Sequence, residues 1–181
     1  MSLKDYKNKN TIIGIAGPSG SGKTTLAEKL SKKIDAKLIR LDNYWKYNDV
    51  NKIPPMKKWK KGIWEKPSTT NFNKVLKEIK RIKESKNPSN IILEGLHTFD
   101  KQKIRKIIDL KIYLSLSDSL IIKRRLKKFG KADNQEWYSK NVVIKFYKKY
   151  GEPKKVYADL IIKGEDDINK NIKKILACLE K

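Results

Sequence analysis

The sequence has a single cysteine, a single histidine and no long apolar run. Because Cys178 stands alone, an internal disulfide and a cluster of thiolate metal ligands are excluded. No apolar run approaches the roughly 20 residues that cross a bilayer, so we expect no membrane-spanning segment. The first ten residues are polar and lack the apolar region of a secretory signal. We therefore expect a cytoplasmic protein, whose thiol stays reduced.

Acidic residues are also scarce. Lysine and arginine total 44 against 20 aspartates and glutamates, which gives a formal net charge of +24. Only five of the basic residues are arginine. Proteins that read nucleic acids depend on arginine, because its planar guanidinium makes paired hydrogen bonds to guanine and phosphate. The composition therefore argues against a nucleic acid as partner, although charge alone does not exclude a polyanion.

Apolar residues alternate between short continuous runs, typical of buried parallel strands, and stripes at helical spacing. Strands are expected at residues 11–16, 37–41, 90–94, 109–116 and 156–162. Helices are expected at residues 24–34, 71–84, 118–128, 138–150 and 166–179, with Asp118 as the N-cap of the third. This alternation predicts an α/β fold with an open parallel sheet. With 38% apolar residues, the chain has core material for one domain, 1–181, in which residues 1–10 form a polar tail.

The strongest motif stands between the first expected strand and the first expected helix. Residues 17–24 read GPSGSGKT and match the phosphate-loop pattern G-x-x-x-x-G-K-[ST]. Its glycines allow successive N–H groups to point at an anion, and the helix N-terminus adds unpaired donors. Lys23 can reach the β- and γ-phosphates. The expected nucleotide-binding residues are Gly17, Ser19, Gly20, Ser21, Gly22, Lys23, Thr24 and Thr25. The motif predicts a P-loop NTPase-type sheet.

A second acidic signal is Glu94, which ends the expected strand 90–94 and precedes a glycine. In open α/β sheets, ligands bind at the carboxyl ends of the strands. A carboxylate at that edge, beside the phosphate loop, can hold Mg²⁺ or its water molecules. We expect Glu94 and the hydroxyl of Thr24 to be the protein ligands of a magnesium site.

Four blocks of the chain resemble the uridine kinase family, within the phosphoribulokinase/uridine kinase group of P-loop kinases. They are residues 13–25 with the phosphate loop, 41–45 (LDNYW), 64–67 (WEKP) and 157–162 (YADLII). The resemblance implies an enzyme that uses ATP and Mg²⁺ to phosphorylate the hydroxyl of a nucleoside or related ribosyl compound. It implies that Asp42 orients and deprotonates that hydroxyl. A carboxylate at a strand end beside the phosphate loop suits this role on chemical grounds as well.

The resemblance also implies an acceptor pocket. Glu65 would bind the ribose hydroxyls, and Trp45 and Trp64 would form aromatic walls. The expected acceptor-binding residues are Tyr44, Trp45, Trp64, Glu65 and His97. Simpler roles are open for several of them, because an aspartate such as Asp42 can cap a turn, tryptophans can fill a loop and His97 can serve its own loop.

A basic helix face leads into an expected lid at residues 129–137. Arg125 and Lys128 lie three residues apart, so they share one face of the expected helix. By resemblance, they would close on the phosphates of ATP, with Arg125 in a catalytic role beside Lys23 and Asp42. A solvated basic face is the alternative.

One part of the resemblance is absent. Uridine kinases usually carry aromatics and a histidine that read the pyrimidine, between the substrate-side helix and the Glu-Gly strand. The corresponding interval here, about residues 81–90, contains neither. The acceptor could therefore be another metabolite, such as a vitamin or a sugar phosphate. A nucleotide-dependent nucleic-acid-binding protein is the alternative from a different class.

Overall fold

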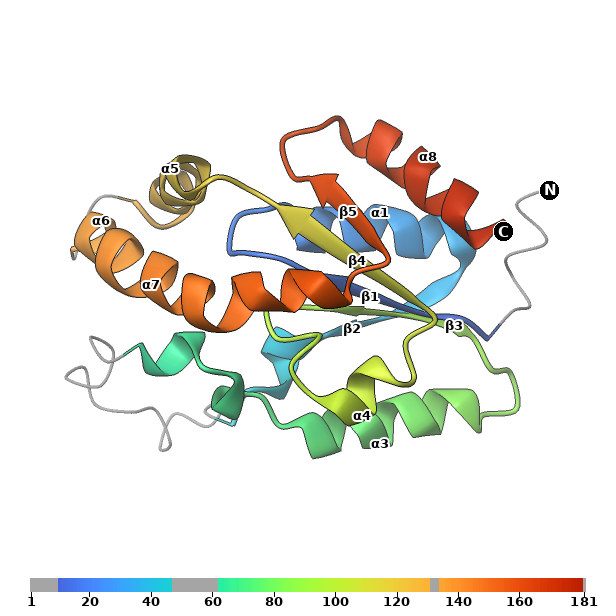
Figure 1. The fold of residues 1–181 in the computed structure, drawn as a ribbon. Coiled ribbons are helices and arrows are strands. Elements are labelled where there is room, and N and C mark those ends of the chain that lie inside the picture. Colours follow the sequence, from blue (N-terminus) through green and yellow to red (C-terminus); the bar gives the residue numbers. More distant parts are fainter. Residues whose placement is uncertain (1–9, 47–61, 131–133, 181) are drawn as a thin grey trace.

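The computed structural model describes residues 10–46, 62–130 and 134–180 (Figure 1). Residues 1–9 of the expected tail and 131–133 of the expected lid lie outside the described residues. The tail and the lid therefore stay predictions.

Five parallel strands form one sheet in the order β2-β3-β1-β4-β5. They are β1 (Ile12–Ala16), β2 (Ala36–Arg40), β3 (Asn90–Glu94), β4 (Leu110–Ser115) and β5 (Leu160–Lys163). Every residue of β1 and β3 is buried, which explains their near-continuous apolar sequence. The predicted open parallel α/β sheet is confirmed.

Helices cover both faces of this sheet (Figure 1). On one face, α1 (Lys23–Ile34) and α8 (Ile168–Leu179) pack against the inward side chains of the strands. On the other face lie α3 (Phe72–Lys83), α4 (Gln102–Arg105) and part of a long helical segment, together with Ile121 of α5 (Asp118–Phe129). The long segment runs through α6 (Gln135–Tyr138), a π-helix Ser139–Val143, α7 (Ile144–Phe146) and a second π-helix Tyr147–Gly151. No helix among the described residues is long and apolar enough to cross a membrane.

Three local expectations differ from the structure. The last strand begins at Leu160 rather than at residue 156, because Glu152–Tyr157 form a 3-10 helix with a proline in its first turn. The N-cap of α5 is Ser117, while Asp118 is already helical and forms an ion pair with Lys148 at 2.7 Å. The four-residue α4 was not expected, since it is too short to show helical periodicity.

The strand order brings three functional segments to one edge of the sheet. β1 and β3 pair directly, with Ile15 opposite Glu94, so the phosphate loop after β1 starts beside the end of β3. β2 pairs with β3 on its other side and continues into a 3-10 helix, Leu41–Tyr44, that carries Asp42. The carboxyl ends of parallel strands form the ligand-binding edge of such sheets.

Candidate active site

Close approaches of the backbone shape the phosphate loop. Gly20 and Gly22 have φ angles of 77° and 92°, a region that favours glycine. Gly17 passes so close to β4 that a Cβ on it would lie 2.3 Å from the carbonyl oxygen of Leu114. α1 then begins at Lys23, and no side chain caps its N-terminus. The first N–H groups of the helix are therefore disposed to receive an anion.

Lys23 lies within this loop. Its Nζ donates to the carbonyl oxygen of Pro18 at 2.7 Å. Burial lowers the pKa of the Lys23 ammonium, and the carboxylates of Glu94 and Asp42 oppose that shift. Negative charge on a bound ligand would act in the same direction as the two carboxylates, so this position suits a phosphate group.

A pair of oxygen ligands lies next to Lys23. The Thr24 hydroxyl donates to Glu94 Oε1 at 3.2 Å, and burial raises the pKa of the Glu94 carboxyl while Lys23 opposes this. Mg²⁺ prefers oxygen ligands and takes few from the protein, since it keeps waters and phosphate oxygens. Among the described residues, no group of three or more histidine, cysteine or acidic side chains could hold a metal. The Thr24–Glu94 pair fits Mg²⁺ that is bound together with a phosphate ligand.

A pocket of about 210 Å³ opens beside the phosphate loop. Its lining brings together most of the predicted catalytic and acceptor-binding side chains, namely Lys23, Thr24, Asp42, Trp45, Trp64, Glu65, Glu94, His97, Arg125 and Lys128. Ser19, Gly20 and Thr70 also line it. We call it the acceptor-side pocket. It joins phosphate-binding groups to a wall of carboxylates and aromatic rings that come from distant parts of the chain.

The aromatic wall consists of two stacked tryptophans. The ring centroids of Trp45 and Trp64 lie 5.3 Å apart, with 28° between their planes. A bridge between Trp45 and Thr70 fixes the first of them to the segment that leads into α3. Both tryptophans therefore line the acceptor-side pocket as one stacked pair, and their role as walls for an acceptor ring stays a prediction.

Glu65 and His97 are the two buried titratable residues, besides Glu94, among the polar residues that line the acceptor-side pocket. Glu65 is buried, and burial raises the pKa of its carboxyl, whereas Arg125, His97 and a hydrogen bond from Tyr138 oppose this. His97 is also buried, and its Nδ1 lies 2.6 Å from Asp100 Oδ2. The carboxylate of Asp100 can only accept, so Nδ1 carries the proton and Nε2 is left for another group. Nε2 has no hydrogen-bond partner within the described parts of the chain.

Arg125 connects the phosphate loop to the helical segment beyond the expected lid. Its Nη1 donates to Ser19 Oγ at 2.8 Å, and its Nε donates to Ser139 Oγ at 3.2 Å. Lys128 lines the same pocket. The basic face predicted for α5 therefore points, at these two residues, toward the phosphate loop rather than only to solvent.

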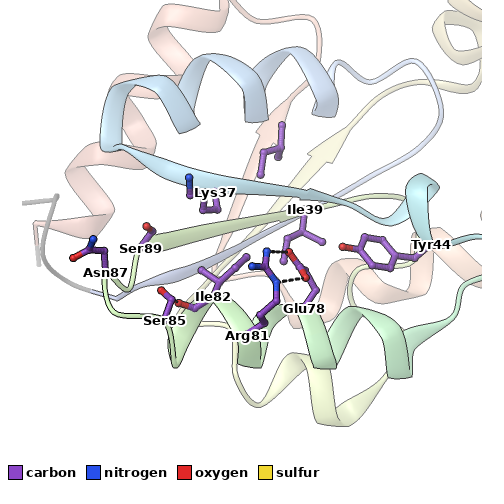
Figure 2. A pocket seen from close by; sticks show the side chains of 10 residues that line it. Lys37, Ile39, Tyr44, Glu78, Arg81, Ile82, Ser85, Asn87 and Ser89 are labelled. Carbon is purple, nitrogen blue, oxygen red and sulfur yellow. Dashed lines mark hydrogen bonds and ion pairs between the residues drawn. The ribbon is translucent and has the colours of Figure 1, made fainter.

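Tyr44 does not join the acceptor-side pocket, contrary to expectation. It lines a different pocket between β2 and α3, next to the pair formed by Arg81 and Glu78 (Figure 2). A 3-10 helix has three residues per turn, so the side chains of Asp42 and Tyr44 leave this helix in different directions. Asp42 lines the acceptor-side pocket, and Tyr44 lines the pocket between β2 and α3. Tyr44 therefore lies apart from the other predicted acceptor-binding residues.

A third pocket, of about 300 Å³, lies between the phosphate loop, α1 and α8. Predicted nucleotide-binding residues Ser21, Gly22 and Thr25 line it, together with Leu26, Lys29, Leu114, Gly164, Asp166, Ile168 and Asn171. We call it the donor-side pocket. The phosphate-loop residues thus divide between two pockets.

Two lining residues of these pockets, and one residue that contacts a lining residue, carried no motif signal in the sequence. Thr70 is buried and its hydroxyl has no partner among the described residues. Tyr138 donates to Glu65 at 3.5 Å, and Asn171 reaches the donor-side pocket from the last helix. The aromatic position of Tyr138 just after the expected lid was the only available hint, because the others belong to no motif.

Fold and site together define a P-loop phosphotransferase that acts on a hydroxyl group. A family model described as an AAA domain matches residues 13–147. The uridine kinase of Borrelia hermsii is 32% identical over 83% of this chain and 85% of its own length. The uridine kinase of Ligilactobacillus salivarius is 26% identical over 92% of both chains. The chain belongs to the uridine kinase family, as the resemblance predicted.

Solved structures of P-loop kinases share the fold. A shikimate kinase from Acinetobacter baumannii, in complex with shikimate, superposes with a TM-score of 0.61 at 16% identity, covering 98% of this chain and 97% of its own. The shikimate kinase of Bacteroides thetaiotaomicron gives 0.59 at 18% identity, with 94% and 99% covered. At this identity the likeness concerns the fold alone, and it confirms the predicted P-loop NTPase-type sheet.

Proposed function

We propose that this protein transfers the γ-phosphoryl group of ATP, bound with Mg²⁺, to the hydroxyl of a nucleoside or a related ribosyl compound. One observation carries the proposal. Asp42, Lys23 and the Thr24–Glu94 pair line one pocket beside the phosphate loop. Phosphoryl transfer requires this combination of a base for the acceptor hydroxyl, a cation for the phosphates and oxygen ligands for a metal.

The chain's own residues divide the work. Asp42 accepts a hydrogen bond from the acceptor hydroxyl and takes its proton as the oxygen attacks the γ-phosphorus. Lys23, Arg125 and Lys128 surround the transferred group with positive charge, where charge develops in the transition state. Thr24 and Glu94 would hold Mg²⁺, which neutralises charge on the β- and γ-phosphates when bound.

The acceptor side supports a polyhydroxy compound. Glu65 is a buried carboxylate close enough to Tyr138 to accept its hydrogen bond, and carboxylates accept hydrogen bonds from sugar hydroxyls. The Trp45–Trp64 pair offers an apolar flat surface for a ring. The names of the relatives, uridine kinases, agree with a ribosyl acceptor.

A second acceptor class is favoured by one specific observation. The turn between α3 and β3 contains neither an aromatic residue nor a histidine, and its Ser85, Asn87 and Ser89 line the pocket of Figure 2 rather than the acceptor-side pocket. No part of this turn therefore supports reading of a pyrimidine ring. A metabolite other than a pyrimidine nucleoside is the second candidate.

The test is ADP release from Mg·ATP with a panel of nucleosides, other ribosides, phosphorylated sugars and an RNA sample. We expect release with one nucleoside or riboside, and its loss in the Lys23→Ala variant, which controls for a contaminating kinase. Release only with a phosphorylated sugar would favour the second candidate. Release only with RNA would overturn the proposal and indicate a nucleotide-dependent nucleic-acid-binding protein.

We also propose a cytoplasmic location, which agrees with the single, free cysteine.

A further inference from the structure

The guanidinium group of Arg125 is held by hydrogen bonds at two of its nitrogens. Its Nε donates to Ser139 Oγ at 3.2 Å, and its Nη1 donates to Ser19 Oγ at 2.8 Å. A guanidinium is planar, with its donors in a fixed fork, so two such contacts set both its position and the direction of its remaining donors. Together they keep the Nη1 side of the group directed at the phosphate loop.

Two aromatic rings also lie near this guanidinium, but they do not set its orientation. Its central carbon is 5.1 Å from the centroid of the Phe129 ring and 5.9 Å from that of the Tyr138 ring. An aromatic face attracts a cation, yet it offers no acceptor atom that fixes how the plane is turned. The orientation of Arg125 therefore depends on the two serine hydroxyls.

Ser139 is a rigid anchor because of the backbone that carries it. It has no exposed surface, and it begins the π-helix Ser139–Val143 directly after α6. Farther along the same helical segment, Val143, Ile144 and Tyr147 belong to the apolar core that contains residues of β1 and β3. π-helical turns are rare and occur frequently at functional sites.

The two anchors of Arg125 differ in what a bound phosphate does to them. Ser19 belongs to the phosphate loop and lines the acceptor-side pocket. A phosphate oxygen there competes with the Ser19 hydroxyl for Nη1, because hydrogen bonds between charged groups are the stronger ones. Ser139 lines neither the acceptor-side nor the donor-side pocket, so a bound ligand does not compete for Nε.

We propose that Ser139 is the positioning residue of Arg125, which it holds at Nε while the Nη nitrogens bind the transferred phosphoryl group. The inference rests on the proposed function, since it takes a nucleotide phosphate as the partner of Arg125. Charges that are already in place when the transition state forms stabilise it most. Without the Ser139 hydroxyl, the long arginine side chain spends less time in the productive rotamer, so the rate of transfer falls.

The test is a double-mutant cycle of Ser139→Ala and Arg125→Ala, followed by steady-state kinetics with Mg·ATP and the acceptor that gives ADP release. Ser139→Ala should lower kcat about five- to tenfold and change the KM for the acceptor by less than about twofold. In the Arg125→Ala background, the same substitution should change kcat by less than about twofold, because no guanidinium remains to be positioned. Effects that multiply in the double variant would overturn the inference.

Tyr147→Phe is the matched control for damage to the same helical segment. It removes a buried hydroxyl that accepts a hydrogen bond from Tyr113 Oη at 3.0 Å, and Tyr147 lines neither pocket. This variant should lower the melting temperature and keep the wild-type kcat. A loss of kcat equal to that of Ser139→Ala would show that Ser139 acts through the stability of the segment, which would overturn the inference.

A second measurement needs no turnover. The proton on Arg125 Nε can be followed by nuclear magnetic resonance, with Arg125→Ala to assign its signal. Ser139→Ala should speed its exchange with solvent by about tenfold or more, since a hydrogen-bonded proton exchanges slowly, and Tyr147→Phe should not. Equal exchange rates in wild type and Ser139→Ala would overturn the inference. A wild type that releases no ADP with any acceptor would instead contradict the proposed function.

Discussion

The two pockets beside the phosphate loop differ in the charge of the side chains that line them. The acceptor-side pocket gathers the charged side chains of Lys23, Asp42, Glu65, Glu94, Arg125 and Lys128. The donor-side pocket has only Lys29 and Asp166 as charged residues, beside apolar side chains and the amide of Asn171. Chemistry that moves charge needs preorganised charges around the reacting atoms. Recognition of a neutral base needs shape and a few fixed polar atoms.

The charged side chains of the acceptor-side pocket include two carboxylates that burial destabilises. Burial raises the pKa of both Glu65 and Glu94, so each carboxylate is less stable in the folded protein than in water. Residues that only served the fold would be replaced by apolar ones at little cost. The comparison between the pockets therefore predicts which substitutions separate chemistry, acceptor binding and stability.

The largest effect is expected from Asp42→Asn. The amide cannot take the proton of the acceptor hydroxyl, so kcat should fall by about 100-fold or more. Asp42 is exposed and lies outside the donor-side pocket, so the dissociation constant of Mg·ATP should stay the same. Steady-state kinetics and calorimetry measure the two quantities. A kcat within a few-fold of wild type would remove Asp42 from the role of base.

A smaller effect, confined to the acceptor, is expected from Thr70→Val. The substitution removes the unpartnered hydroxyl at nearly constant volume, so the KM for the acceptor should rise about three- to tenfold. The KM for ATP should not change, since Thr70 does not line the donor-side pocket.

Thr69, which precedes Thr70, is the matched control for the placement of Thr70 in the acceptor-side pocket. Thr69 Oγ1 donates to the Lys66 carbonyl oxygen at 2.7 Å, within its own turn. Thr69→Val should therefore lower the melting temperature and leave both KM values unchanged. An equal rise in the acceptor KM for both variants would show that Thr70 acts through the fold.

The smallest effect is expected on stability, from Glu65→Gln. Because the pKa of Glu65 is raised in the folded protein, the unfolded chain releases this proton at a lower pH than the folded protein does. The free energy of unfolding therefore falls as the pH rises from the Glu65 pKa of the unfolded chain to that of the folded protein. At pH 7 the ionised Glu65 consequently destabilises the fold. Gln removes this cost, so the melting temperature should rise by about 2–4 °C for each kcal/mol recovered.

Two comparisons check this sign. Below about pH 3 the Glu65 side chain is protonated in both the folded and the unfolded state, so the wild type and Glu65→Gln should melt at the same temperature. Glu165→Gln, on the exposed loop after β5, should not reproduce the gain at pH 7. A lower melting temperature for Glu65→Gln at pH 7 would mean that Arg125 and His97 more than compensate for burial.

Glu65→Gln should also bind the acceptor less tightly than the wild type does.

Structural features that lie within one continuous stretch of sequence could be predicted, because their geometry depends on residues close together along the chain. The phosphate loop lies within eight consecutive residues, and the expected strand 90–94 is β3 as the structure has it. Glu94 could be placed beside the loop from one general rule, since parallel strands present their carboxyl ends at one edge. The amphipathic stripe of α3 was equally legible, with Phe72, Val75 and Ile79 buried.

Positions that depend on a single turn were not readable. Tyr44 follows Asp42 by two residues, yet the short 3-10 helix turns it into another pocket. Val156 looked like a strand residue, but it is 79% exposed in a 3-10 helix. Local apolar character does not decide whether a neighbouring strand is within reach.

The sequence by itself determined the parallel α/β sheet, the phosphate loop and the family, because periodicity and short motifs depend on neighbours along the chain. The tertiary structure alone decided that Thr70 and His97 share a pocket with Asp42, and that Asn171 shares one with Ser21. These partners lie 28 to 150 residues apart. Their proximity follows from strand order and helix packing, which bring side chains together in space without any fixed spacing in the chain.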